Sequence, residues 1–188
     1  MSRISYLGYE AIGDEGRAVW DEVIKTRGSD FVNVEGSSAA LGVWAQAPSV
    51  AGAALALGAA AKYASSLDRD LSELAIITVG ARWKAEFEFF AHAQIALEHG
   101  VEQAAVDAIA AGIEPELTND RRRIVYRVAK QLADQGTVEP STLDRVVAEL
   151  GLTSTIELVT LCGYYTMVAF MLNAFEVPLP TGVAPRWP

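Results

Sequence analysis

Apolar residues recur at intervals of three and four positions along most of the chain, and this spacing is typical of amphipathic helices. Alternating apolar and polar positions, which would indicate a strand, form no convincing run. Glycine, proline and short polar residues separate the periodic segments. The pattern therefore predicts helices joined by loops, with the helices at about residues 14–28, 37–47, 48–66, 69–83, 84–100, 101–112, 119–136, 140–151 and 154–175.

Capping residues mark several of these boundaries. Pro48 suits the first turn of a helix, and Asp68 is placed as an N-cap with acidic residues after it. Ser154 and Glu157 have the spacing of a capping box, so they predict the start of the last helix. The proline-rich residues 177–188 cannot continue that helix, and we expect them to be extended.

The composition supports a helical fold. Hydrophobic residues make up 51% of the 188 positions, and alanine dominates them. Alanine with few β-branched runs favours helix over sheet. A chain of this length fits one domain with a sizeable core. We therefore predict a single all-α domain over residues 1–188.

Charge and cysteine content limit the partners and the compartment. The formal charge of −9 would repel phosphate backbones, so neither nucleic acid nor an anionic membrane surface is an expected partner. The single cysteine, Cys162, excludes an internal disulfide, and its apolar neighbours indicate a buried structural thiol. Residues 1–16 carry acids and no apolar segment typical of a secretory signal. Together these features favour a cytoplasmic location.

Two uncharged segments, residues 36–61 and 158–175, are long enough to compare with a membrane span. Pro48 and many small residues interrupt the first segment. The second contains polar residues such as Thr160 and Asn173, and it lacks flanking basic residues. We expect the second segment to be a helix buried inside an oligomer and not a membrane span.

Candidate chemistry is concentrated in residues 84–100, KAEFEFFAHAQIALEHG, which hold both histidines of the chain. On a helix, Glu88 and His92 are four positions apart and share one face. His99 falls near the same stripe, whereas Glu86 points roughly the opposite way. The stripe of one carboxylate and two imidazoles is the candidate functional feature.

Three interpretations of this stripe are open from the pattern alone. The first is a surface Glu–His pair on an ordinary amphipathic helix. The second is a metal site, which the gap of about 10 Å along the axis between the histidines disfavours. The third is acid–base chemistry, because phenylalanines around Glu88 would disfavour its charged form and a histidine can share the proton.

Glu73 joins the third interpretation only if the chain folds back on itself. In one continuous helix over residues 71–99, Glu73 and Glu88 would stand about 22 Å apart and could not cooperate. A break between Gly80 and Ala85 would let the two segments pack together, and Gly80 weakens a helix at that place. The predicted site therefore depends on this break.

The residues RDLSELAIITVGARWKAEFEFFAHAQIALEHGVEQAAVDAIAAG, at about 68–112, resemble the carboxymuconolactone decarboxylase family of the alkylhydroperoxidase-D-like superfamily. A Glu on one helix, followed by Glu-x-x-x-His on the next, carries the resemblance. Residues 153–188 are similar to the C-terminal helix and tail of longer members, and residues 1–47 form an N-terminal helical extension. The resemblance implies an all-α fold that assembles as trimers or hexamers, with a pocket near the subunit contacts.

The peroxidase branch of this superfamily has a C-x-x-C pair seven and four residues before its histidine. Ala85 and Glu88 occupy those positions here, while Glu73 and His92 match the proton-relay glutamate and the histidine. The missing thiols disfavour thiol-dependent peroxidase chemistry. The resemblance therefore implies a lyase for a small carboxylated lactone or a related intermediate of aromatic-acid breakdown, with no cofactor or metal.

Each candidate residue has an expected role in that reaction. After loss of carbon dioxide, we expect His92 to return a proton to the carbanion, Glu88 to orient or polarise His92, and Glu73 to complete the relay. Arg82 is the candidate for binding the carboxylate of a small anionic substrate. The alternatives are an alkylhydroperoxidase-like peroxide-handling protein and a non-catalytic ligand-binding oligomer.

Overall fold

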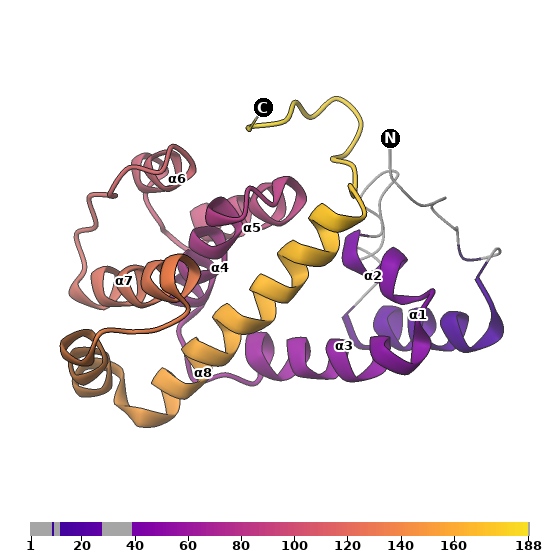
Figure 1. Cartoon of the computed structure of the whole chain (residues 1–188), viewed down its shortest axis with the longest axis horizontal. Coiled ribbons are helices and arrows are strands. Elements are labelled where there is room, and N and C mark those ends of the chain that lie inside the picture. Colours follow the sequence, from indigo (N-terminus) through magenta and orange to yellow (C-terminus); the bar gives the residue numbers. More distant parts are fainter. Residues whose placement is uncertain (1–8, 10–11, 28–38, 188) are drawn as a thin grey trace.

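The computed structural model of the chain describes residues 9, 12–27 and 39–187. Regular secondary structure among these residues is helical and includes no strand, so the prediction of an all-α fold is confirmed (Figure 1). The expected start of a helix at residue 37 lies outside the described residues. The helices are α1 (Asp14–Arg27), α2 (Ala39–Trp44), α3 (Pro48–Tyr63), α4 (Arg69–Arg82), α5 (Glu86–Glu98), α6 (Gln103–Ala110), α7 (Asp120–Gln135) and α8 (Pro140–Ala174).

Helix α4 lies at the centre of the fold. Every residue from Leu71 to Gly80 is buried, because α5, α7 and α8 pack around this helix. The long helix α8 runs diagonally between α4–α7 on one side and α1–α3 on the other (Figure 1). Polar side chains carried by α4 are therefore held away from water, where they need partners within the protein.

The predicted break between Gly80 and Ala85 is confirmed. Helix α4 ends at Arg82 and α5 begins at Glu86. The Ala85 N–H donates to the Gly80 carbonyl at 2.9 Å, and Lys84 adopts a φ of 49°, in the left-handed region that commonly follows a helix. The two helices fold back and pack against each other, so the predicted site residues do not lie along one continuous rod.

Helix α8 contains both of the helices predicted for residues 140–175, with Gly151 between them at φ 82° and ψ 161°. The capping-box prediction for Ser154 and Glu157 is wrong. The Glu157 carboxylate instead accepts hydrogen bonds from the Ser65 hydroxyl at 3.0 Å and from the Ser66 N–H and hydroxyl at 2.8 and 2.7 Å. These bonds fasten the α3–α4 connection to α8.

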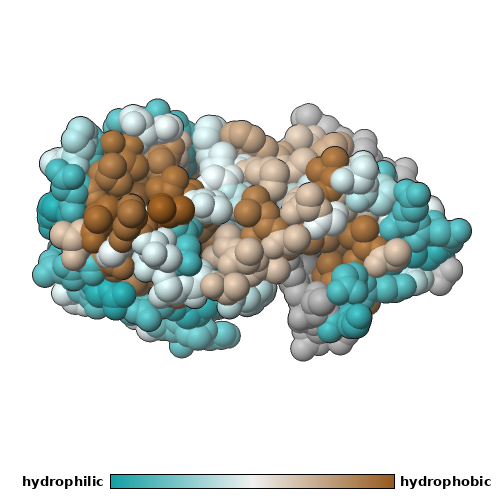
Figure 2. All heavy atoms as spheres, turned by 90° about the horizontal axis from the view of Figure 1, so that it is seen from below, coloured by the Kyte–Doolittle hydropathy of each residue, from teal (hydrophilic) through white to brown (hydrophobic). Residues whose placement is uncertain are grey.

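Helix α8 is also the part of the described chain that is long and apolar enough to cross a membrane. Half of its most apolar window is buried inside the protein. On its outer side Leu152 and Ile156 are 64% and 57% exposed, and hydrophobic side chains gather on the face shown in Figure 2. The predicted burial of this face in a homo-oligomer stays a prediction.

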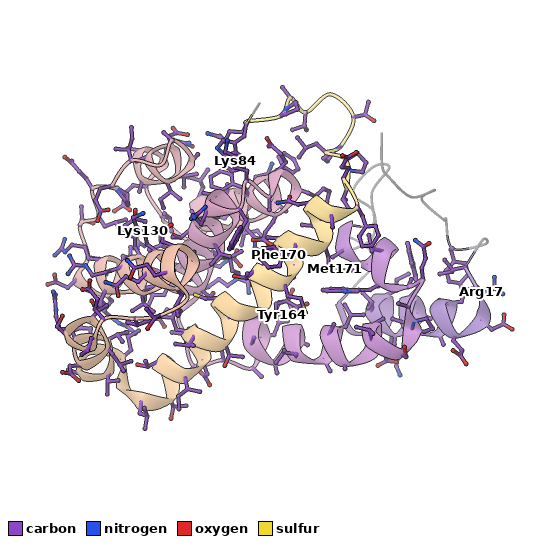
Figure 3. All side chains as sticks on the ribbon, viewed as in Figure 1. Arg17, Lys84, Lys130, Tyr164, Phe170 and Met171 are labelled. Carbon is purple, nitrogen blue, oxygen red and sulfur yellow. The ribbon has the colours of Figure 1, made fainter. Side chains whose placement is uncertain are left out.

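Helices α3 and α8 approach closely where Gly58 faces Tyr164, which lies on the side of α8 turned toward α3 (Figure 3). A Cβ atom on Gly58 would stand 2.2 Å from the Tyr164 hydroxyl oxygen and 2.3 Å from its ring carbon. Real side chains do not approach this closely, so only glycine fits without moving a buried aromatic ring. The contact fixes one wall of the site described below.

We therefore expect Gly58→Ala to lower the free energy of unfolding by about 1–3 kcal/mol, as overpacked sites do. Gly52 on the same helix is the matched control, since nothing lies within 4 Å of a Cβ added there. Gly52→Ala should raise stability by up to about 1 kcal/mol through helix propensity. Urea unfolding of both variants tests this, and equal effects of the two substitutions would contradict the close contact.

Candidate acid–base site

The centre of the candidate site is a hydrogen bond between α4 and α5. Glu73 on α4 is fully buried, and its Oε2 lies 2.6 Å from Nδ1 of His92 on α5. The turn after α4 makes this contact possible, because it brings residues 19 positions apart onto facing helices. The structure thus brings together two of the residues that the sequence nominated.

Two cations meet the other oxygen of the same carboxylate. Arg69, one helical turn before Glu73 on α4, places a terminal nitrogen 3.1 Å from Oε1, and the Lys62 ammonium on α3 lies 3.5 Å from it. Burial alone would raise the pKa of Glu73, but the interactions with His92, Lys62 and Arg69 outweigh burial and lower it. Glu73 is therefore an ionised carboxylate at neutral pH.

His92 is held as a neutral imidazole. Burial and the positive charge of Lys62 disfavour its protonated form, and they lower the pKa of His92 to about 4 despite the opposing Glu73 charge. A carboxylate only accepts hydrogen bonds. Nδ1 of the neutral ring therefore carries a proton and donates a hydrogen bond to Glu73. The other ring nitrogen, Nε2, is left without a proton and is the basic atom of the ring.

The pKa of Glu88 is shifted in the opposite direction to that of Glu73. Its side chain is buried, and neither carboxyl oxygen has a hydrogen-bond partner among the described residues. Burial raises the pKa of Glu88 well above its ordinary value, and the charge of Lys62 opposes this only in part. Burial therefore favours the neutral, protonated form of the Glu88 carboxyl, which has one proton that it can donate.

Glu88 and His92 both face one cavity of about 260 Å³. The walls are mainly apolar and aromatic, as is typical of pockets for small organic ligands. Lys62, Tyr63 and Arg69 supply its polar side, while α2, α3 and α8 supply most of the apolar lining through Leu41, Trp44, Leu55, Tyr164, Tyr165, Val168 and Leu172.

An aromatic stack supports His92 from α8. The Tyr165 ring meets the imidazole edge-on at 4.9 Å between centroids, and Tyr164 meets Tyr165 in the same way at 5.3 Å. Burial, with the nearby Glu73 charge, raises the pKa of Tyr165 well above its ordinary value, so this phenol stays neutral. The stack fixes the imidazole plane relative to the cavity.

Two polar residues of the cavity, Lys62 and Arg69, were not predicted from the sequence. Lys62 is the single charged residue within 36–66, and an isolated charge in an apolar helix signals a polar contact inside the protein. Arg69 stands four residues before Glu73, at the spacing of a helical ion pair. Both signals were present, but neither shows by itself that the two cations converge on one carboxylate.

The structure does not bring Arg82 or His99 to this cavity. Arg82 follows Glu73 by nine residues, which places it about half a turn away around α4. Its Nε bonds to Asp134 of α7 at 2.6 Å, and its position gives no support to carboxylate binding beside Glu88. His99 is the exposed C-cap of α5. Of the three residues in the predicted stripe, only Glu88 and His92 line this cavity.

Metal and thiol chemistry have no apparent centre among the described residues. No three His, Cys, Asp or Glu side chains of the described chain come together in a group that could hold a metal ion. Cys162 is buried, as predicted, and burial raises the pKa of its thiol to about 12. It does not line the cavity that contains His92.

The buried acid predicts a particular pH dependence of stability. A carboxyl whose pKa is raised by folding keeps its proton in the native state and loses it in the unfolded state, so stability falls as pH rises above the unfolded pKa. Glu88→Gln removes this loss. Relative to wild type, the variant should therefore gain about 1.4 kcal/mol per pH unit above pH 5, until Glu88 itself ionises in the native protein.

Urea unfolding at pH 5, 6 and 7 measures this difference. Glu98, an exposed carboxylate on the same helix, provides the control substitution Glu98→Gln. A constant difference between wild type and Glu88→Gln over this pH range would contradict a neutral Glu88.

No protein-family model and no curated protein matches the chain. Among solved structures, it is similar to an uncharacterized peroxidase-related protein from Ralstonia eutropha JMP134 that has an alkylhydroperoxidase AhpD core. The match has a TM-score of 0.75 and covers 100% of this chain and 97% of that one, at 17% sequence identity. The chain therefore has the AhpD-like fold that its sequence predicted, and at this identity the likeness shows the fold alone.

Proposed function

We propose that the protein is a carboxymuconolactone-decarboxylase-like lyase that acts by acid–base chemistry on a small carboxylated substrate. One observation carries the proposal: the same cavity is lined by the buried Glu88 carboxyl, which has no hydrogen-bond partner among the described residues, and by His92, whose Nδ1 is bonded to Glu73. A proton donor and a proton acceptor with separated pKa values are what such a reaction requires.

The reaction removes a carboxylate as carbon dioxide and adds a proton to a carbon of the resulting dienolate. The electrons of the broken carbon–carbon bond pass into the conjugated lactone as carbon dioxide leaves, and a dienolate remains. Glu88 delivers its proton to the reacting carbon, and it recovers one from solvent by way of His92 Nε2. Atoms and charge balance without an oxidant, a reductant or a cofactor.

The proposed roles differ from those expected from the sequence alone. His92 was expected to be the acid. Burial lowers its pKa to about 4, however, so the imidazole is mostly neutral at neutral pH. Glu88 holds its proton under the same conditions because burial raises its pKa. We therefore assign proton donation to Glu88, proton relay to His92, and orientation of His92 to Glu73.

The proposed substrate-binding residues are Lys62 and Arg69 of this cavity, and not Arg82. Lys62 and Arg69 both line the cavity, and each lies within ion-pair distance of the Glu73 carboxylate. A substrate carboxylate placed there would be attracted by both charges, while the aromatic and aliphatic walls would hold the ring. The predicted substrate is thus a small organic anion.

A peroxide-handling function has less support. That chemistry needs a thiolate, and Cys162 is buried outside the cavity with a pKa raised to about 12. Ala85 and Glu88 stand at the positions of the two cysteines in the peroxidase branch that the sequence resembles.

The activity test is carbon dioxide release from a panel of carboxylated lactones, carboxymuconolactone included. We expect Glu88→Gln and His92→Ala to lower kcat by about 10²–10⁴-fold, the usual contribution of a general acid or base. In deuterium oxide the product should gain one deuterium, at the dienolate carbon that receives the proton.

His99→Ala is the matched control, because His99 is the other histidine of the chain and is exposed at the end of α5. It should keep the turnover of the wild type. Full turnover in His92→Ala would contradict the assignment, and tight binding of the anions without any carbon dioxide release would favour a non-catalytic binding protein.

The thiol provides a separate prediction. Because Cys162 is 3% exposed and its pKa is raised, it should not react with a thiol reagent or with alkyl hydroperoxide in the native protein at pH 7. After denaturation in urea, one thiol per chain should react. Rapid hydroperoxide consumption by the native protein, lost in Cys162→Ser, would overturn the lyase proposal in favour of the peroxide alternative.

A further inference from the structure

A second cleft, of about 590 Å³, lies between α4, α6, α7 and the C-terminal tail. It shares no lining residue with the acid–base cavity, although both border α4. Thr78, Ala81 and Arg82 form its α4 wall, and Tyr126 and Trp187 give it two aromatic side chains. Nothing in the proposed lyase reaction uses this cleft.

The charge of this cleft is opposite to that of the chain. Four cationic side chains and two acidic ones line it, an excess of two positive charges in a protein whose formal charge is −9: Arg82, Lys84, Lys130 and Arg186 against Asp107 and Asp134. A concave surface with a net positive charge attracts anionic ligands.

The cations are held in place by the fold. One carboxylate, that of Asp134, bonds Arg82 through Oδ1 at 2.6 Å and Lys130 through Oδ2 at 2.8 Å. Lys84 projects from the α4–α5 turn, and within the described chain its ammonium has no ion pair or hydrogen bond. Lys84 and Lys130 lie on the same side of α8 (Figure 3). Both ammonium groups line the cleft, so one ligand in it can contact both.

The tail wall is equally well fixed. The Glu86 carboxylate accepts the backbone N–H groups of Arg186 and Trp187 at 2.9 and 2.6 Å. The Trp187 indole donates to the Ala110 carbonyl at 2.9 Å, and its ring meets Phe89 edge-on at 5.2 Å. A preorganised wall lowers the entropy cost of binding, so this cleft differs from a mobile charged surface.

We propose that this cleft is a binding site for a small organic dianion, a phosphate ester or a dicarboxylate, held by Lys84, Lys130 and Arg82 with its carbon skeleton against Trp187. Two negative charges match the excess of two positive ones, and the volume admits a substituted organic ion larger than free phosphate. The site is independent of the lyase proposal.

Isothermal titration calorimetry with inorganic phosphate and with phthalate, at constant ionic strength, tests the site. We expect saturable binding of at least one probe with one site per chain. The affinity should fall about tenfold or more in Lys84→Gln/Lys130→Gln, since each substitution removes a charge-assisted contact with the anion. Phosphate binding alone would indicate phosphate esters, and phthalate binding alone would indicate dicarboxylates.

The single variant Lys84→Gln guards against a folding artefact, because it breaks no ion pair of the described chain and should still weaken binding. Lys25→Gln on α1 removes an exposed charge far from the cleft and should leave affinity unchanged. Absence of saturable binding, or equal affinity in the double variant, would each overturn the proposal.

Discussion

The hydrogen bond between Glu73 and His92 is the constraint on which the rest of the site depends. It joins the central helix to α5 inside the core, at 2.6 Å, and Arg69 and Lys62 converge on the same carboxylate. Removing one member of such a buried ionic cluster typically costs about 3–5 kcal/mol, because the remaining charges lose their compensation. The cluster is therefore structural as well as chemical, and it sets the protonation state of the imidazole.

The same cluster separates the states of the two glutamates. Glu73 is surrounded by cations and a donor, so it is ionised, whereas Glu88 faces apolar and aromatic walls and is neutral. In the proposed reaction, the surroundings of these two glutamates make one a positioning carboxylate and the other a proton donor. The positive charge of Lys62 lowers the pKa of both glutamates. Lys62 lies on α3, outside the segment that resembles the decarboxylase family.

Much of the fold was readable from the sequence, because helical periodicity, Pro48 and the weak point at Gly80 are local signals. The pairing of Glu73 with His92 followed from the resemblance together with the break between the helices. The cavity walls could not be predicted from the sequence, since they depend on how α2, α3 and α8 meet.

Ser154 and Glu157 show the limit of a local motif. They do not form the predicted capping box, and they instead make hydrogen bonds with a loop 88 to 92 residues away. Arg82 lies away from the acid–base cavity, because it follows Glu73 by nine residues and so lies on the opposite face of α4.

Nitrogen-15 NMR of His92 between pH 5.5 and 8, with assignment by the His92→Ala variant, tests the central claim most directly. A neutral ring with its proton on Nδ1 and none on Nε2 over this whole range is the result expected for an imidazole tied to an ionised Glu73. A ring protonated on both nitrogens at pH 7, or one that carries its proton on Nε2, would contradict it.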